Sequence, residues 1–385
     1  MATEALPRFT VIIPTRERAD VLGAALRTVV AQDYENLRIL ISDNFSQDNT
    51  ADIVESFKDQ RIHYINTGRR LSMSHNWEFA LSHIEDGWVS ILGDDDGLMP
   101  GAIAKVAELA VTSGASAIRS STCKYRWPSR DGKGARLSAP TQRGVELRDS
   151  RIWLQRALDG QAGYMDLPML YTGGFADIRL MLAIKARMRA FYSSCVPDVY
   201  SGVAIASITD RYLYSYAPLA IAGISRHSTG TAHFSRPNNR TELSPAKLFM
   251  SEGNIPFHSD IPVCSDGITP RSPQVTLLES FLQSSELRGP VSPDLYARQL
   301  AIVAATCAPD DRDLAQWIED FATLHGLDTK KVLKSNMLRR LRNKIREIPK
   351  KNWRRLKTAK LRPPQYEIND VYLASLAAQQ RLGGG

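Results

Sequence analysis

Residues 88–103 read WVSILGDDDGLMPGAI, and they place three consecutive aspartates directly after a short apolar run. The run is typical of a buried β-strand, and Pro100 is typical of the first turn of a following helix. Two carboxylates about 4 Å apart repel each other by roughly 4 kcal/mol at an effective dielectric constant near 20. Because a hard divalent cation removes this cost, a strand end carrying Asp94, Asp95 and Asp96 favours a Mg²⁺ or Mn²⁺ site over a solvated acidic turn.

The same pattern of strand and helix surrounds this stretch. Apolar, β-branched runs predict strands at residues 9–13, 38–42, 61–65, 88–92 and 116–121. Between these runs, apolar residues recur at helical spacing. Strands that alternate with helices in this way predict an α/β fold, with a mostly parallel, Rossmann-like sheet and helices on both faces. In such sheets ligands bind beyond the carboxyl ends of the strands, so the candidate site residues are those that follow each strand.

After residue 120 this alternation weakens. Residues 125–144 are rich in Gly, Pro, Ser and Arg, which predicts a long loop, and a polar, Pro-rich connection spans about 235–275. The remaining segments predict a helical region that follows the sheet. The segments with helical apolar spacing are 150–158, 177–190, 199–216, 275–285, 293–307 and 311–324.

Four segments in chain order make the sequence similar to a known family. They are FTVIIPTRER (9–18), RILISDNFSQDNT (38–50), GRRLSMSHNWEFAL (68–81) and WVSILGDDDGLMPGAI (88–103). Together they resemble the family 2 glycosyltransferases, which have the GT-A (nucleotide-diphospho-sugar transferase) fold. The resemblance covers residues 8–125 strongly and extends more loosely to about residue 235. It implies an inverting, metal-dependent transfer of a sugar from a nucleotide-diphospho-sugar, expected to be a UDP-sugar, to a glycan or lipid-linked acceptor. The commonest setting of such enzymes is bacterial surface-polysaccharide biosynthesis.

The resemblance also implies which residues bind the nucleotide-sugar. The first strand end matches the loop along the base and ribose, and Asp43 matches the acid that usually hydrogen-bonds the uracil or ribose. Arg70 and Asn76 match the segment beside the ribose and diphosphate. A capping aspartate at 43 and a surface arginine at 70 are the structural alternatives. The full set of matching positions is Pro14, Thr15, Glu17, Asp43, Arg70, Asn76, Asp94 and Asp95.

The metal site implied by the resemblance is a DXD-type motif that holds Mn²⁺ or Mg²⁺ on the diphosphate. Asp94 and Asp96 match its two ligands, and His227 matches a late histidine that completes the metal or diphosphate shell in many GT-A enzymes. The sequence departs from the family at Gly93, where many members have the first aspartate, so Asp95 and Asp96 are an alternative pair. Asn44 and Phe45 likewise replace the usual Asp-Gly.

The catalytic base implied by the resemblance is Asp198, in CVPDVYSGVAIA (195–206). A positioned carboxylate there would take the proton from the acceptor hydroxyl. The alternative is that Asp198 only caps the following helix, and Asp210 is the second candidate for the base. The segment YTGGF (171–175) is a candidate acceptor-side loop.

Composition limits the other classes. The chain has 385 residues, of which 43% are hydrophobic and 23% charged, as in a globular protein. No apolar run approaches the roughly 20 residues of a membrane span, the start lacks a secretory signal, and four widely spaced cysteines show no metal-finger pattern. These features argue against a secreted disulfide scaffold, a zinc finger and an integral membrane protein, and we expect a cytoplasmic location.

The net charge of +8 conceals a strongly basic segment. Residues 330–362 carry fifteen Lys or Arg and one acid, whereas residues 1–329 hold a net charge of about −5. Residues 330–349 have the spacing of a basic amphipathic helix, with Trp353 beyond it as an interfacial anchor. This predicts a peripheral contact with the anionic inner face of the cell membrane, and packing on the body is the alternative.

The sequence therefore predicts three parts. They are a GT-A catalytic domain at 1–240 (nucleotide half 8–125, acceptor half 126–240), a Pro-rich and helical region at 241–329, and a basic tail at 330–385. The main functional alternative is a non-catalytic nucleotide-sugar or carbohydrate-binding module. A sugar nucleotidyltransferase is disfavoured because the first strand end lacks glycine, and a nucleic-acid partner is not expected because no aromatic platform accompanies the basic tail.

Overall fold

The protein is described by a computed structural model that covers residues 6–128, 134–227, 252–264, 269–270, 272–289, 291–308, 310–331, 358–361 and 368–383. Its first half is built on the predicted parallel strands. These are β1 (Phe9–Thr15), β2 (Leu37–Asp43), β3 (Ile62–Asn66) and β4 (Trp88–Ile91), in the spatial order β3-β2-β1-β4. The apolar runs fill these strands, and the last residues of β1, β2 and β3 lie in register at one edge of the sheet.

Beyond β4 the sheet continues with further strands that are mostly paired antiparallel, and among them the sequence predicted only the one at residues 116–121. The strands added there are β5 (Gly97–Leu98), β6 (Ala117–Arg126), β7 (Arg136–Pro140), β8 (Val145–Asp149), β9 (Gly174–Asp177), β10 (Arg211–Ile224) and β11 (Thr358–Leu361). The long strand β10 runs parallel to β6 and antiparallel to β5 and β8. The predicted α/β architecture is therefore confirmed, with a parallel centre and a mixed outer half.

Two local predictions were wrong in this outer half. Residues 125–144 contain β7, so they are not one continuous loop. The helix predicted over 199–216 is α7 (Pro197–Ile208), which ends at Ile208, and β10 begins at Arg211. Tyr212, Tyr214 and Tyr216 alternate along β10 with the two-residue period of a strand, and this short alternation was mistaken for the end of a helix.

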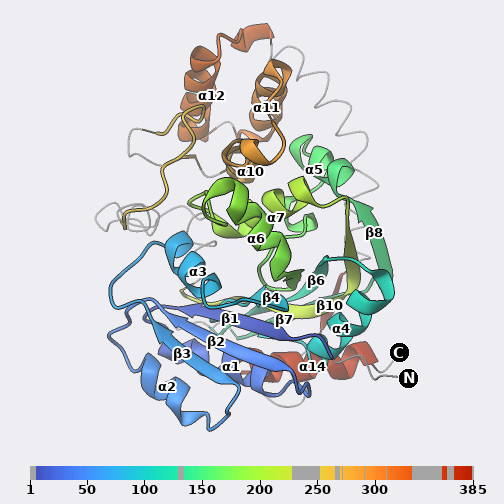
Figure 1. Ribbon diagram of the computed structural model, residues 1–385. Helices are drawn as coiled ribbons and strands as arrows, with labels where there is room; N and C mark the ends of the chain where they lie inside the picture. Colours follow the sequence, from blue (N-terminus) through green and yellow to red (C-terminus); the bar gives the residue numbers. More distant parts are fainter. Residues whose placement is uncertain are drawn as a thin grey trace.

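Helices cover both faces of the sheet (Figure 1). On one face, α1 (Ala19–Val30) and α4 (Ala102–Ser113) share one hydrophobic cluster with the sheet. On the other face, α3 (Met73–Leu81), α6 (Ile178–Met188) and α7 share a second cluster. The short helix α2 (Thr50–Ser56) contacts α1. The two clusters hold the sheet between them and leave its carboxyl edge for polar residues.

The predicted helical region contains α10 (Pro273–Gln283), α11 (Pro293–Thr306) and α12 (Arg312–Leu324), which pack around Trp317 and Phe321. A further cluster joins α10 to α7 and to α5 (Ser150–Leu158). In Figure 1 this region stands on the α6 and α7 side of the sheet. The described helices include none that is long and apolar enough to span a membrane.

The end of the chain returns to the sheet-bearing part. Strand β11 pairs with β7, and α14 (Val371–Gly383) lies against α1 (Figure 1). Val371, Ala374 and Ala378 of α14 are fully buried in the same cluster as α1 and α4. The predicted amphipathic helix over 330–349 and the adjoining residues to 357 lie outside the described residues, apart from its first two positions. Residues 358–361 and 371–383 are thus integral to the fold.

Candidate active site

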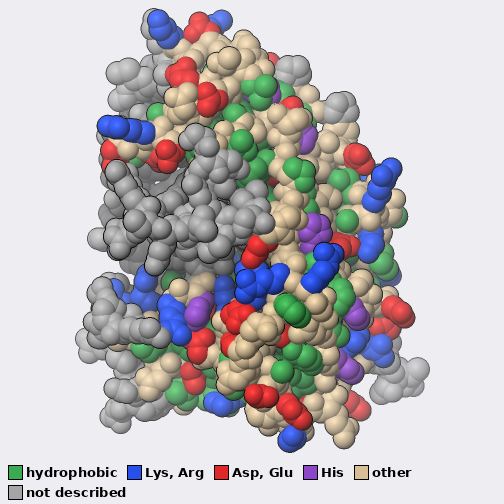
Figure 2. Space-filling view, turned by 90° about the vertical axis from the view of Figure 1, so that its left-hand side faces the viewer, with side chains coloured by type: hydrophobic (Ala, Val, Ile, Leu, Met, Phe, Trp, Pro, Cys, Tyr) green, Lys and Arg blue, Asp and Glu red, His purple; other side chains and the backbone are tan. Residues whose placement is uncertain are grey.

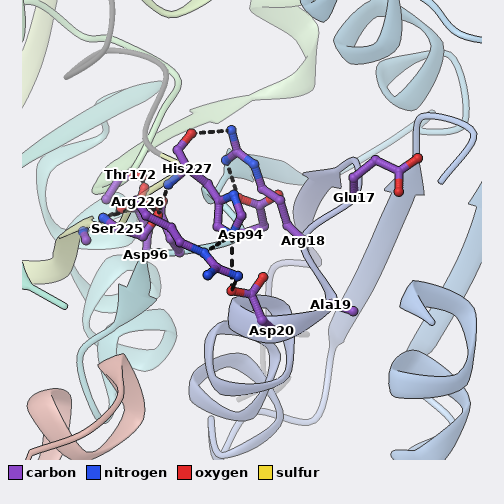
Figure 3. Close-up of polar contacts among 12 residues, drawn as sticks. Glu17, Arg18, Ala19, Asp20, Asp94, Asp96, Thr172, Ser225, Arg226 and His227 are labelled. Atoms are coloured by element: carbon purple, nitrogen blue, oxygen red, sulfur yellow. Dashed lines mark hydrogen bonds and ion pairs between the residues drawn. The ribbon is translucent and has the colours of Figure 1, made fainter. Parts of the chain in front are cut away.

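The three aspartates follow β4 and lie at the carboxyl edge of the sheet, where the sequence placed them. Their exposed fractions are 3% for Asp94, 4% for Asp95 and 2% for Asp96. Three buried carboxylates in sequence require compensating donors or cations. The donors come from the β1 end, from the segment before β9, and from the end of β10 (Figure 3).

Asp94 forms an ion pair with Arg18. The Nη1 atom of Arg18 lies 2.7 Å from Asp94 Oδ1, and its Nη2 donates a 2.7 Å hydrogen bond to the carbonyl oxygen of His227. Burial raises the pKa of Asp94, and the Arg18 guanidinium opposes that shift. Burial lowers the pKa of Arg18, but the charge of Asp94 outweighs this and leaves the pKa raised. The pair links the β1–α1 loop to the end of β10.

Asp95 and Asp96 are held by the end of β10. Ser225 Oγ donates to Asp95 Oδ2 at 2.6 Å, and the Gly223 amide donates to Asp96 Oδ1 at 2.6 Å. Thr172 Oγ1 donates to Asp96 Oδ2. Burial and the charge of Asp95 raise the pKa of Asp96 to about 7, although these hydrogen bonds lower it. The loop thus holds three adjacent buried carboxyl groups against donors from distant parts of the chain.

Two glycines permit this close packing. A Cβ atom on Gly223 would lie 1.8 Å from the carbonyl oxygen of Asp95, so only glycine allows β10 to approach the aspartate loop. A Cβ atom on Gly93 would lie 2.5 Å from both Asp96 Oδ2 and the Tyr171 hydroxyl. The carboxylate of Asp96 therefore occupies the space beside position 93, where the family usually has its first aspartate.

Backbone strain gathers at the same edge. Among the described residues, four non-glycine residues have positive φ, and three of them are Glu17 (55°), Phe45 (61°) and Thr172 (20°). The first two follow β1 and β2, and Thr172 bonds Asp96. Such conformations cost on the order of 1–3 kcal/mol each and cluster at functional sites. At position 45, where the family usually has glycine, a conformation that glycine adopts freely is held by phenylalanine.

The predicted nucleotide-binding residues lie along the ends of β1, β2 and β3. Pro14 and Thr15 end β1, and Glu17 Oε1 lies 3.4 Å from Arg70 Nη2. Asp43 is 1% exposed; its Oδ1 accepts from the Ser46 amide and its Oδ2 from Tyr64 and Asn66. These bonds tie β2 to β3.

Asn76 points toward the sheet, where its Oδ1 accepts a 2.7 Å hydrogen bond from Ser42. A pocket of about 450 Å³ opens beside Arg70, on the other side of α3 from this bond. Six of its lining residues are Arg69, Arg70, Ser72, His75, Glu78 and Glu252. Basic, acidic and histidine side chains also gather across the middle of the face shown in Figure 2.

His227 lies at the site, but its ring is directed elsewhere. Its Nε2 is 3.0 Å from Asp20 Oδ2 and 3.0 Å from Arg226 Nε, and Arg226 also pairs with Asp20 (Figure 3). The backbone of His227 reaches the aspartate network, through its carbonyl oxygen on Arg18 and its amide on Ser225 Oγ at 3.1 Å. In this arrangement the segment after β10 is fastened to the start of α1.

Asp198 occupies the first turn of α7, after Pro197 at the first helical position. Burial raises the pKa of its carboxyl group, while backbone amides and the Arg119 charge lower it. Tyr171 interacts electrostatically with both Asp96 and Asp198, and its ring stacks on Trp77 at 5.4 Å. The Tyr171 hydroxyl thus interacts electrostatically with both the aspartate loop and Asp198. Asp210, by contrast, is exposed between α7 and β10.

Several residues at this site were not identified from the sequence. Arg119 is 2% exposed and donates to the carbonyl oxygens of Met165, Tyr171 and Thr172, so it fixes the segment that carries Tyr171 and Thr172. This segment includes the predicted acceptor-side loop. Arg18 stands directly beside the predicted Glu17, and that adjacency was the only sequence signal for it.

The carboxylates of Asp94, Asp95 and Asp96 are the candidate ligands for a divalent cation. Carboxylate oxygens are the ligands that Mg²⁺ and Mn²⁺ prefer, and burial, with the charge of Asp95, raises the pKa of Asp96. Within the described ranges, however, no group of three His, Cys, Asp or Glu side chains is arranged around a common point for a metal. The carboxylates are therefore the right type of ligand for a divalent cation, while Arg18 supplies a positive charge beside Asp94.

Comparison with known proteins finds relatives of the N-terminal part of the chain. Residues 10–162 match the model of the family described as Glycosyl transferase family 2. The GalNAc(5)-diNAcBac-PP-undecaprenol beta-1,3-glucosyltransferase of Campylobacter jejuni is 32% identical over 108 residues, which cover 27% of this chain and 35% of that protein. The succinoglycan biosynthesis protein ExoO of Rhizobium meliloti is 23% identical over 114 residues, covering 30% and 33%.

Among solved structures, S. aureus TarS 1–349 in complex with UDP-GlcNAc has a TM-score of 0.46 and 13% identity, over 83% of this chain and 90% of that one. The matched segments span about a third of the length of the two curated relatives. Residues 10–162 are thus similar to glycosyltransferase family 2.

Proposed function

We propose that this protein is an inverting, metal-dependent glycosyltransferase. It would move a sugar from a nucleotide-diphospho-sugar to a glycan or lipid-linked acceptor. The observation that carries this proposal is a buried aspartate loop and a half-buried carboxyl group, Asp198, which both interact electrostatically with Tyr171. An inverting transfer needs these two features, because one holds the donor diphosphate and the other activates the acceptor.

Asp198 is the proposed base. Its carboxylate would take the proton from the acceptor hydroxyl as that oxygen attacks the anomeric carbon from the face opposite the leaving nucleoside diphosphate. Burial supports this role, since a raised pKa brings the carboxyl group closer to the pH at which a base works best. Arg119 would hold the Tyr171 segment and keep Asp198 ionised through its charge.

Asp94 and Asp96, with Asp95 as the alternative partner, would hold Mn²⁺ or Mg²⁺, and His227 would join them only after its ring leaves Asp20. The bound cation would offset the charge that develops on the departing diphosphate. The nucleotide side would be formed by Pro14, Thr15, Glu17, Asp43, Arg70 and Asn76. A UDP-sugar is the proposed donor because the family counterpart of Asp43 usually binds uracil or ribose.

The proposed setting is bacterial surface-polysaccharide assembly at the inner face of the cell membrane. Two relatives support this setting, since one is a glucosyltransferase named for an undecaprenol-linked glycan and the other is a succinoglycan biosynthesis protein. The membrane contact itself is proposed for residues 330–362, most of which lie outside the described residues. Their fifteen basic residues support an anionic surface as partner.

The experiment is a panel of UDP-, GDP- and dTDP-sugars with Mn²⁺ or Mg²⁺, read by nucleotide release and by thermal unfolding. A nucleotide at about 100 times its dissociation constant should stabilise the protein by roughly 2.7 kcal/mol. This gain should need a divalent ion in the wild type and be lost when Asp94 and Asp96 are both replaced by Ala. Equal stabilisation in EDTA would contradict the metal role. Binding without nucleotide release, for every donor and acceptor tried, would instead indicate a non-catalytic binding module.

A further inference from the structure

Arg18 pairs with one of the carboxylates proposed to hold the cation, and its side chain is more exposed than that carboxylate. The residue precedes α1, and its carbonyl oxygen accepts hydrogen bonds from the amides of Val21 and Leu22. Its side chain is 23% exposed, whereas the Asp94 side chain is 4% exposed. The guanidinium can therefore leave toward solvent by side-chain rotation, but the carboxylate cannot.

We propose that Arg18 is an internal counter-ion of the aspartate loop, which a divalent cation must displace from Asp94. Arg18 uses both arms of its guanidinium here, one on Asp94 Oδ1 and one on the His227 carbonyl, each at 2.7 Å. A cation bound by the same carboxylates would lie beside this guanidinium, and like charges at such distances repel strongly in a buried site. Metal binding and the Arg18–Asp94 pair therefore exclude each other.

This competition has a consequence that rests on the proposed function. A diphosphate brings negative charge that can hold both the cation and the released guanidinium. The loop should then bind a divalent cation weakly by itself and more tightly together with the nucleotide. Arg18 would thus make cation binding depend on the donor substrate.

The test measures Mn²⁺ binding to the full-length protein without nucleotide, from the electron paramagnetic resonance signal of free Mn²⁺. Arg18→Gln removes the competing charge, so it should bind Mn²⁺ at least about tenfold more tightly than the wild type, the worth of one charge-assisted hydrogen bond. Arg16→Gln is the matched control, because Arg16 lies in the same loop but pairs with Glu252 at 2.6 Å. The Mn²⁺ affinity of Arg16→Gln should equal that of the wild type.

An Arg18→Gln protein whose Mn²⁺ affinity equals or falls below that of the wild type would overturn the proposal. Should this variant lose its fold, Arg18→Lys decides instead. It keeps the charge but loses the two-armed geometry, so it should bind Mn²⁺ more tightly than the wild type by a smaller factor, and an unchanged affinity overturns the proposal.

Adding UDP tests whether the nucleotide and the cation bind together. The difference in Mn²⁺ affinity between wild type and Arg18→Gln should become smaller when UDP is present. An unchanged difference would contradict this coupling. Failure of nucleotide release in both proteins would count against the proposed function. The comparison of Mn²⁺ affinities without nucleotide is independent of that result.

Discussion

Glu279 is a carboxyl group buried where the helical region meets the sheet-bearing part. It lies on α10 with an exposed fraction of 1%, and its Oε2 accepts a 2.5 Å hydrogen bond from Ser194 Oγ. Burial raises the pKa of Glu279 to about 7, against the effect of this hydrogen bond. The folded protein therefore keeps a proton on Glu279 over a pH range in which the unfolded chain releases it.

The raised pKa of Glu279 makes the free energy of unfolding depend on pH. Between about pH 4.5 and pH 7 the unfolded chain binds fewer protons at this residue than the folded protein, so the free energy of unfolding falls as pH rises. Glu279→Gln removes the titration. Its stability relative to the wild type should rise by about 2–3 kcal/mol from pH 5 to pH 8, measured by urea unfolding at both pH values. The exposed Glu286→Gln is the control, and a pH-independent difference for Glu279→Gln would refute the assignment.

Individual site residues differ in how far the sequence revealed them. Asp94, Asp95 and Asp96 could be found because three adjacent carboxylates after an apolar run are costly without a partner. Thr172 and Ser225 could not, since their importance comes only from strands that meet the aspartate loop from about 75 and 130 residues further along the chain. No sequence pattern around a Thr or Ser predicts that its hydroxyl will bond to a buried carboxylate.

At the scale of elements, the parallel half of the fold was predictable and the returning elements were not. The strands β1 to β4 are continuous apolar runs, which depend on local sequence. Strand β11 and helix α14 depend on what they pack against. Val371, Ala374 and Ala378 have helical spacing but are small, so the sequence alone gave little reason to place them in the core. The tail that was predicted to be separate therefore ends inside the fold.

Helix α14 should consequently be required for stability. A chain that ends at residue 367 loses the buried side chains of Ile368 and Val371, and full burial of two such residues is worth on the order of 5 kcal/mol. Its thermal unfolding temperature should fall well below that of the full chain. Removal of only Gly384 and Gly385 is the control. If both truncated chains unfold at the wild-type temperature, α14 does not stabilise the fold.

The packing of β11 and α14 also decides which variant can test the proposed membrane contact. A truncation before the basic segment would remove β11 and α14 together with the charges. Loss of vesicle binding in such a protein would not separate misfolding from loss of charge. Replacing Lys and Arg residues within 330–357 keeps both elements, so it is the sharper comparison with anionic and neutral vesicles.

At the scale of the whole molecule, the candidate site lies where two parts of the chain meet. The aspartate loop belongs to the parallel half of the sheet, and Asp198 begins α7, which packs against both the sheet and the helical region. The central claim is that the first part holds the donor while Asp198 activates the acceptor. Binding and turnover should then be separable by mutation.

The most direct measurement compares nucleotide binding and sugar transfer in Asp198→Asn, with the exposed Asp210→Asn as matched control. Asp198→Asn should keep the nucleotide dissociation constant within about twofold and lose roughly 10² to 10⁴ in turnover, the usual worth of a positioned general base. Asp210→Asn should retain both. Near-wild-type turnover in Asp198→Asn, with an inactive Asp210→Asn, would contradict the account.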